Sequence, residues 1–235
     1  MSKIVGVVFD FDGTLVQSNE IKKETYYLAA KDVGCPFEIV DQTLADIPRG
    51  DRHQLIGAMA AEMQSQNLLG PGVLPQHFAL DFTSLYSELC EAAISTCPEV
   101  EGASDTLREL RHRNIEVFLN SATPKNYLER IARNRSFFGE VSAIYGAPTA
   151  KADNNNAILD SLKCTASEIM FVGDGQDDLE AATKTGCHFT GIRGGRGKFS
   201  VETFPTVADL RQLLPLIDNI DCQSSNVPMA TGTSI

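Results

Sequence analysis

The chain has few cysteines and no cysteine motif. Its 235 residues hold six cysteines, and none of them forms a Cys-x-x-Cys pair or the spacing of a zinc site. In a chain of this length, scattered cysteines favour reduced thiols over a disulfide framework. The four histidines do not cluster either, so we expect them to be structural or surface residues. The cysteines lie at positions 35, 90, 97, 164, 187 and 222, and the histidines at 53, 77, 112 and 188.

Long hydrophobic runs are also absent. No stretch approaches the roughly 18 consecutive apolar residues of a transmembrane helix. The first apolar run, Ile4–Phe9, is too short for the core of a signal peptide, and acidic residues follow it at once. We therefore expect a soluble, cytoplasmic protein.

Positive charge is scarce. The chain has 20 Lys and Arg against 31 Asp and Glu, which gives a formal net charge of -11. An acidic surface repels phosphate backbones and anionic lipids, so we expect neither nucleic acid nor membrane as a partner. An anionic substrate would need local positive charge or a bound cation at its site. Nothing in the sequence indicates an oligomeric state.

Short apolar runs alternate with helix-like stretches over most of the chain. Continuous β-branched or apolar runs are typical of strands buried on both faces of a parallel sheet. We expect strands at residues 4–9, 115–119, 141–145, 169–172 and 188–192, and helices at 103–113, 124–134, 154–162 and 177–185. This alternation predicts a doubly wound, Rossmann-like α/β sheet.

Residues 18–97 break the alternation and predict an inserted helical domain. Helical patterns cover residues 20–33, 51–66 and 75–95, and no convincing strand lies between them. The core domain would then comprise residues 1–17 and 98–217. Residues 218–235 contain few apolar side chains, so a flexible tail is expected there.

Acidic and phosphate-binding residue types follow the predicted strands. Asp10 and Asp12 come after the first strand, Ser121 after the second and Asp174 after another, while Lys151 precedes a helix. Ligands of open α/β sheets bind beyond the carboxyl ends of the strands. Residues two apart in extended backbone point the same way, so the first two carboxylates can face one ligand. An acid-rich site without a His or Cys cluster favours Mg²⁺ over zinc.

A single Asp-x-Asp is usually a solvated turn, and helix capping accounts for one acid near residue 177. Neither explanation accounts for acids after two separate strands together with the crowded run Gly173–Asp178. We therefore favour a phosphoryl-transfer site.

These residues resemble the motifs of the haloacid dehalogenase superfamily. Its first motif, Asp-x-Asp-Gly-Thr, matches Asp10–Thr14, and its second, a strand ending in Ser or Thr, matches Phe118–Ser121. Its third, a Lys before a helix, fits Lys151, although Ala152 replaces the Pro that often follows. Its fourth, Gly-Asp-x-x-x-Asp, matches Gly173–Asp178. The order and spacing agree over about residues 4–192, and members with a helical cap, of the phosphoglycolate phosphatase or β-phosphoglucomutase kind, are the most similar in organisation.

The resemblance implies a role for each matched position. Asp10 would be the nucleophile, and Asp12 the general acid and then the general base. Mg²⁺ would be held by Asp10, by the backbone carbonyl of Asp12 and by Asp174. The residues implied to bind the phosphoryl group are Ser121, Lys151, Gly13, Thr14 and Ala122. Those implied to support the metal site are Asp178 and, as an alternate, Asp177.

The resemblance also implies that the helical insertion is a cap that closes over the site. Its segment Ile47–His53 is a turn with two arginines and a histidine before a helix. We expect Arg49 first, and Arg52 less strongly, to contact substrate, whereas a contact from His53 is left open. A plain surface turn at a helix N-terminus explains the segment equally well.

The implied activity is a Mg²⁺-dependent phosphatase that acts on a small phosphorylated metabolite. A phosphomutase of the same superfamily is the main alternative, because the motifs do not separate the two. A dehalogenase is disfavoured because Asp12 is present, and a non-catalytic binding protein because no motif residue is lost. A phosphate loop at Gly191–Phe199 is excluded as a Walker motif, since Ile192 and Phe199 stand where Gly and Ser or Thr are needed; we expect a flexible loop there.

Overall fold

The computed structural model describes residues 3–193, residue 199 and residues 203–225. The chain divides into two compact units. The core unit comprises residues 1–17 and 98–235, and the helical unit comprises residues 18–97. The flexible loop predicted at residues 191–199 falls largely on residues 194–198, which lie outside the described residues.

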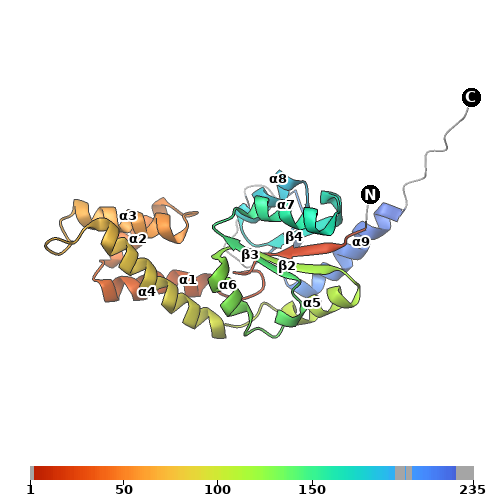
Figure 1. The fold of residues 1–235 in the computed structure, drawn as a ribbon, viewed down its shortest axis with the longest axis horizontal. Coiled ribbons are helices and arrows are strands. Elements are labelled where there is room, and N and C mark those ends of the chain that lie inside the picture. Colours follow the sequence, from red (N-terminus) through yellow and green to blue (C-terminus); the bar gives the residue numbers. More distant parts are fainter. Residues whose placement is uncertain (1–2, 194–198, 200–202, 226–235) are drawn as a thin grey trace, which may run out of the picture. The chain divides into compact units, whose positions relative to one another are not determined.

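One parallel sheet organises the core unit, and it confirms the predicted α/β fold (Figure 1). The strands run in the order β3-β2-β1-β4-β5-β6, and every pairing is parallel. Strand β1 therefore lies between β2 and β4, at the point where the strand order reverses, and ligands of such sheets bind there. The strands are β1 (Gly6–Phe9), β2 (Glu116–Pro124), β3 (Ala143–Ala147), β4 (Ile169–Gly173), β5 (His188–Ile192) and β6 (Thr206–Val207).

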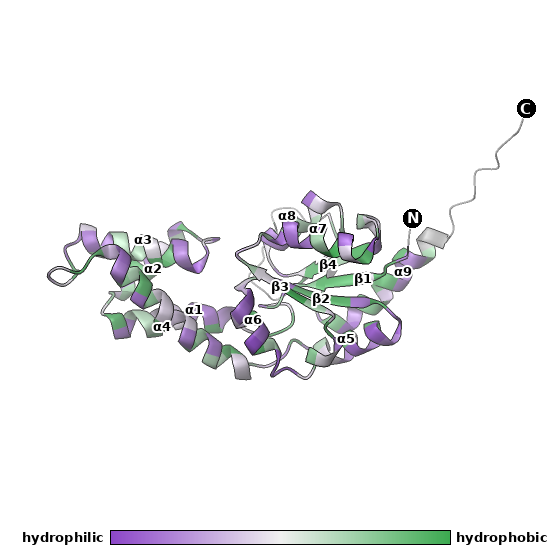
Figure 2. Cartoon of the chain, in the orientation of Figure 1, coloured by the Kyte–Doolittle hydropathy of each residue, from purple (hydrophilic) through white to green (hydrophobic). Residues whose placement is uncertain are grey.

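Helices cover both faces of this sheet. Figure 1 shows α7 and α8 on one face and α5 and α9 on the other. In Figure 2 the central strands are hydrophobic, whereas the helices that cover them carry hydrophilic residues as well. The helices of the core unit are α5 (Ala103–His112), α6 (Lys125–Ala132), α7 (Lys151–Leu162), α8 (Gln176–Thr185) and α9 (Leu213–Ser225), with short 3₁₀ turns at Phe138–Glu140, Ala166–Glu168 and Leu210–Gln212.

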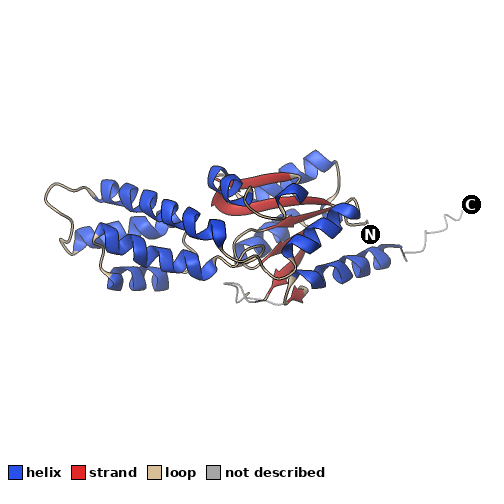
Figure 3. Ribbon diagram, turned by 90° about the horizontal axis from the view of Figure 1, so that it is seen from below, coloured by secondary structure: helices blue, strands red, loops and turns tan. Residues whose placement is uncertain are grey.

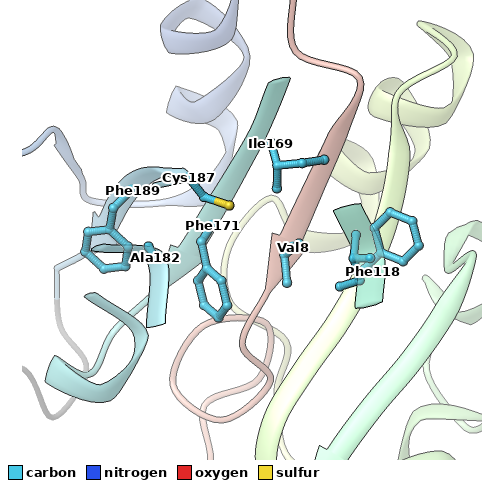
Figure 4. Packing of buried hydrophobic residues seen from close by; sticks show 8 residues of the cluster. Val8, Phe118, Ile169, Phe171, Ala182, Cys187 and Phe189 are labelled. Carbon is cyan, nitrogen blue, oxygen red and sulfur yellow. The ribbon is translucent and has the colours of Figure 1, made fainter. Parts of the chain in front are cut away.

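A row of buried side chains across four strands fixes the register of the sheet. Val8 is aligned with Phe118 on one side and with Phe171 on the other, and Phe171 is aligned with Phe189. These side chains pack with Ile158 of α7 and with residues of α8 on the same face (Figure 4). Because side chains alternate along a strand, a one-residue slip would turn the whole row to the other face. The strand ends that carry the acidic residues are therefore held at fixed positions.

The helical unit is described over its full length and contains helices and loops without a strand (Figure 3). Helix α4 packs against both α1 and α3, and the rings of Tyr26 and Tyr86 stack at 4.2 Å between centroids. Phe82 is fully buried in this interior. The helices are α1 (Asn19–Val33), α2 (Phe37–Asp46), α3 (Arg52–Ser65) and α4 (Pro75–Thr96).

The structure corrects several predicted boundaries. Helix α2 and the strand β6 were not predicted. The buried face of α2 is only Ile39, Val40 and Thr43, and β6 has only two residues. Strand β2 continues to Pro124, so Ser121 lies inside a strand rather than after it. Helix α7 begins at Lys151 rather than at Asn154.

The predicted flexible tail begins too early. Helix α9 continues to Ser225, and its Leu213 and Ile217 are buried. Asp218 accepts a hydrogen bond from Arg113 at 2.9 Å, and Asp221 accepts one from the backbone N–H of Ile4 at 2.9 Å. These contacts hold a segment whose composition alone indicates a tail. Residues 226–235 lie outside the described residues.

Within the described part of the chain, no helix combines the length and the apolar character that crossing a membrane requires.

Candidate active site

Asp10 lies one residue beyond the central strand β1. Its backbone N–H donates to the carbonyl of Val172 in β4 at 2.9 Å, which continues the pairing of the two strands. Its side chain is only 6% exposed. A carboxylate is therefore fixed at the middle of the sheet edge and removed from bulk water.

Lys151, the first residue of α7, is the ammonium closest to this carboxylate in the described structure. Its Nζ donates to Asp10 Oδ1 at 3.0 Å and to Asp178 Oδ1 at 2.5 Å, and it lies 2.7 Å from Asp177 Oδ2. The side chains of Lys151 and Asp178 are 10% and 1% exposed, whereas that of Asp177 is 61% exposed. One buried ammonium is thus shared among three carboxylates.

Negative charge exceeds positive charge around Lys151. Burial raises the pKa of Asp10 to about 7, and Asp174, Asp12 and Asp177 add to this rise against the opposing effect of Lys151. Burial likewise raises the pKa of Asp178, again against Lys151. Burial alone would lower the pKa of Lys151, but the surrounding carboxylates raise it well above its usual value. The site therefore favours an additional cation.

Three buried carboxylates lie close enough together to hold that cation. Asp10, Asp174 and Asp178 each offer an oxygen, and the three oxygens lie within 4.8 Å of one another. Oxygen-only, carboxylate-rich ligand sets suit Mg²⁺. Asp178 can join this set because its side chain packs directly against the backbone of Gly173. A Cβ at position 173 would lie 2.4 Å from Asp178 Cγ. The side chains of Asp12 and Asp177 are not part of this set.

Asp12 is turned toward the sheet edge by a tight turn. Gly13 has a φ of +76°, a backbone conformation that glycine adopts most readily, and its N–H donates to the carbonyl of Val16 at 2.8 Å. Thr123 Oγ1, from the end of β2, donates to Asp12 Oδ2 at 3.0 Å. Thr14 is fully buried, and its hydroxyl has no hydrogen-bond partner among the described residues. The second carboxylate of the motif is therefore fixed by a residue 111 positions away.

Ser121 and Ala122 lie on the neighbouring strand β2. Ser121 is 2% exposed, and its hydroxyl accepts from the backbone N–H of Thr123 at 3.2 Å. Ala122 is exposed. Because Phe9 of β1 is aligned with Leu119 of β2, both residues lie at the same edge of the sheet as Asp10.

The arginines of the helical unit differ from each other. Arg49 lies in the turn before α3 and lines a hollow together with Asp46, Pro48 and Gln54. Arg52 donates to Ser87 Oγ at 2.9 Å and lies 5.7 Å above the ring of Tyr86, so it packs within the unit. His53 is exposed on α3. The capping box of α3, in which Asp51 and Gln54 each accept a backbone N–H from the other, defines this turn.

Two residues that contact the site at the sheet edge were not predicted from the sequence. Thr123 contacts Asp12, and Asn120 donates to the backbone carbonyl of Lys151 at 2.9 Å. A buried Asn at the end of an apolar strand was the available signal for Asn120, because buried amides need partners.

Comparison with known proteins identifies the family. A family model described as "Haloacid dehalogenase-like hydrolase" matches residues 7–192. The chain belongs to this family. The predicted resemblance is therefore confirmed over most of the core unit and all of the helical unit.

Relatives of this haloacid dehalogenase-like hydrolase are phosphatases. A phosphoglycolate phosphatase of Aliivibrio fischeri is 26% identical over 188 residues, which cover 77% of this chain and 81% of the relative. Another, from Vibrio cholerae, is 25% identical and covers 83% of this chain and 87% of the relative. The chain is accordingly a phosphoric monoester hydrolase of the family.

Solved structures share its fold. A predicted phosphoglycolate phosphatase from Haemophilus somnus has a TM-score of 0.76 at 19% identity, covering 92% of this chain and 99% of that one. CbbY from Rhodobacter sphaeroides, crystallised with xylulose-(1,5)bisphosphate, has a TM-score of 0.69 at 17% identity, covering 89% and 96%. These similarities show that the fold is shared over most of the chain.

Proposed function

We propose that this hydrolase is a Mg²⁺-dependent phosphatase that cleaves a small phosphorylated acid of the 2-phosphoglycolate class through an aspartyl-phosphate on Asp10. The observation that carries the proposal is the contact of Lys151 with Asp10 beside the carboxylates of Asp174 and Asp178. The curated relatives support the substrate class, since several of them are phosphoglycolate phosphatases.

The residues present fit a magnesium ion. Asp10, Asp174 and Asp178 supply carboxylate oxygens, and the backbone carbonyl of Asp12 is a further candidate ligand. Burial and then the neighbouring carboxylates raise the pKa of Asp10, and a bound dication would favour its charged form. When bound, Mg²⁺ would offset the charge of the phosphate and of the attacking carboxylate.

Asp10 attacks the phosphorus, a P–O bond forms to its carboxylate, and the bond to the leaving oxygen breaks. Asp12 gives its proton to that oxygen, so an alcohol leaves. Ser121 and Lys151 bind the phosphoryl oxygens through the displacement.

Hydrolysis of the intermediate then restores Asp10. Asp12 takes a proton from water, the water oxygen bonds to phosphorus, and the acyl phosphate bond breaks. The electron pair returns to the Asp10 carboxylate and inorganic phosphate leaves. In a mutase a second substrate hydroxyl would take the place of this water.

The decisive experiment measures phosphate release from 2-phosphoglycolate, sugar phosphates, nucleotides and an aryl phosphate, with Mg²⁺ and with EDTA. We expect Mg²⁺-dependent turnover that Asp10→Asn abolishes. Asp153→Asn is the matched control, because Asp153 is an exposed acid in the first turn of the same helix as Lys151. Full activity in EDTA would overturn the metal site. An isomerised sugar phosphate without net phosphate release would identify a mutase instead.

A further inference from the structure

Three asparagine side chains are buried together between strand β2 and helix α7. Asn120 is 0% exposed, Asn155 1% and Asn154 4%. Asn120 lies at the carboxyl end of the apolar part of β2, directly before Ser121. The other two lie in the first turns of the helix that begins with Lys151. This cluster joins the strand of the serine to the helix of the lysine.

The hydrogen bonds in the cluster have a direction. Asn154 Nδ2 donates to Asn120 Oδ1 at 3.0 Å. Asn120 Nδ2 then donates twice, to the backbone carbonyl of Lys151 at 2.9 Å and to Asn155 Oδ1 at 2.9 Å. Asn120 thus uses both amide hydrogens and its oxygen, and one of its bonds ends on the main chain of the lysine itself.

The cluster is not arranged for stability alone. Asn155 Nδ2 is buried and has no hydrogen-bond partner among the described residues. Leaving a buried donor unpaired costs free energy, and apolar side chains of similar size commonly serve as well between a strand and a helix. What the amides add is a directed bond to one backbone atom, which packing does not supply.

Fixing the backbone of Lys151 matters because its side chain is long. The groups that hold its Nζ in this structure are Asp10, Asp177 and Asp178, and two of these are the proposed metal ligands and nucleophile. Carboxylates that turn toward a metal and a phosphate hold the ammonium less strongly. The start of the helix must then set its position.

We infer that Asn120 is a positioning residue that fixes the main chain of Lys151 so that its ammonium meets the transferring phosphate. This inference rests on the proposed function. It requires the donor hydrogens of Asn120, and it requires only the acceptor oxygen of Asn155. The same chemical change, Asn to Asp, should therefore weaken phosphate binding at Asn120 and leave it nearly unchanged at Asn155.

The test compares Asn120→Asp with Asn155→Asp. The first replaces the donor facing the Lys151 carbonyl by a second oxygen, so we expect KM and the inhibition constant of inorganic phosphate to rise about tenfold or more. The second keeps the oxygen that Asn120 donates to and removes only the unpaired NH₂, so we expect both constants to stay within about twofold. Both variants are assayed well below their melting temperatures, which are measured in parallel. Asn120→Ala replaces the first variant if that protein does not fold.

A cycle with Lys151 separates positioning from general structural support. The dissociation constant of inorganic phosphate is measured by calorimetry with Mg²⁺ in wild type, Asn120→Asp, Lys151→Met and the double variant. Since Asn120 acts through Lys151, we expect it to have no further effect on phosphate binding once Lys151 is Met. Equal effects of the two Asn→Asp changes, or an Asn120 effect that persists in Lys151→Met, would overturn the inference. A wild type that binds phosphate but hydrolyses no substrate would instead count against the proposed function.

Discussion

The two units of this hydrolase bury polar groups in opposite ways. The buried acids that the structure describes, Asp10, Asp12, Asp174 and Asp178, all lie in the core unit. In the helical unit the buried polar side chains are hydroxyls such as Thr25 and Ser87, and each donates to a carbonyl four residues earlier in its own helix at 2.7 Å. Hydroxyls satisfied in this way cost little. Burial and, after it, neighbouring carboxylates raise the pKa of Asp10 and of Asp178, so the core unit gives up stability where it places its acidic residues.

The largest expected effect separates activity from stability at Asp10. We expect Asp10→Asn to lower kcat by about 10⁴-fold or more, as loss of a nucleophile does in comparable enzymes. The same change removes a buried charge from an over-acidic cluster, so the metal-free variant should melt at a higher temperature than the metal-free wild type. Calorimetry in EDTA and phosphate release in Mg²⁺ measure the two effects. A variant that is both inactive and less stable in EDTA would refute the idea that this carboxylate is costly.

Substitution of buried apolar residues should destabilise both units, in contrast to the expected effect of Asp10→Asn. Phe171→Ala and Phe82→Ala each remove a buried ring, from the sheet face and from the helical interior respectively. Each should lower the free energy of unfolding by about 3–5 kcal/mol. Urea titrations followed by circular dichroism provide the measurement. A cost below about 1 kcal/mol at either site would show that its packing is looser than the burial indicates.

Stability of the metal-free protein should fall as pH rises toward 7. The folded pKa of Asp10 is about 7 against a usual value of 3.8, so between these values the folded state keeps a proton that the unfolded chain has released. The contribution is therefore most favourable below about pH 4 and is lost as pH rises through 7. The raised pKa of Asp178 acts in the same direction. Mg²⁺ should raise the melting temperature more at pH 8 than at pH 5. Asp10→Asn, which cannot titrate, should show a weaker pH dependence.

The two arginines of the turn before α3 offer the smallest and most specific contrast. Arg49→Ala should raise KM severalfold with a smaller change in kcat, if Arg49 contacts the substrate as the family resemblance implies. Arg52→Ala should leave KM unchanged and cost about 1 kcal/mol of stability, because it loses its contacts with Ser87 and Tyr86. Steady-state kinetics and thermal melting distinguish the pair. Equal effects of both substitutions on KM would remove the distinction between them.

Local patterns in the sequence predicted the sheet and its acidic edge well. Asp10 and Asp174 were found because each comes at the end of a fully apolar run. Such a run predicts a buried strand and shows where the strand ends. Helix α2 was missed because a helix with a narrow buried face resembles a polar loop. Strand β6 was missed because two residues are too few to show the alternation of apolar and polar side chains that marks a strand.

Pairings between distant residues escaped prediction for a different reason. Thr123 contacts Asp12 and Asn120 contacts Lys151 only because β1, β2 and α7 come together in space. Which carboxylates join the metal set is similarly a matter of geometry. Motif order left Asp177 and Asp178 open as alternates, and the close approach at Gly173 brings Asp178 to the cluster while Asp177 stays exposed.

The central place of β1 has a consequence for how the chain is made. Strand β1 precedes the whole helical unit along the chain, yet its partners at Glu116 and Ile169 come more than a hundred residues later. The neighbours of Asp10 therefore assemble only after residue 178 has been translated, whereas α1 to α4 can pack with one another well before that. Long-range parallel pairing of this kind is slow to form. We expect the nascent chain to hold a folded helical segment beside an unpaired hydrophobic strand, which makes β1 the segment most in need of chaperone protection during synthesis.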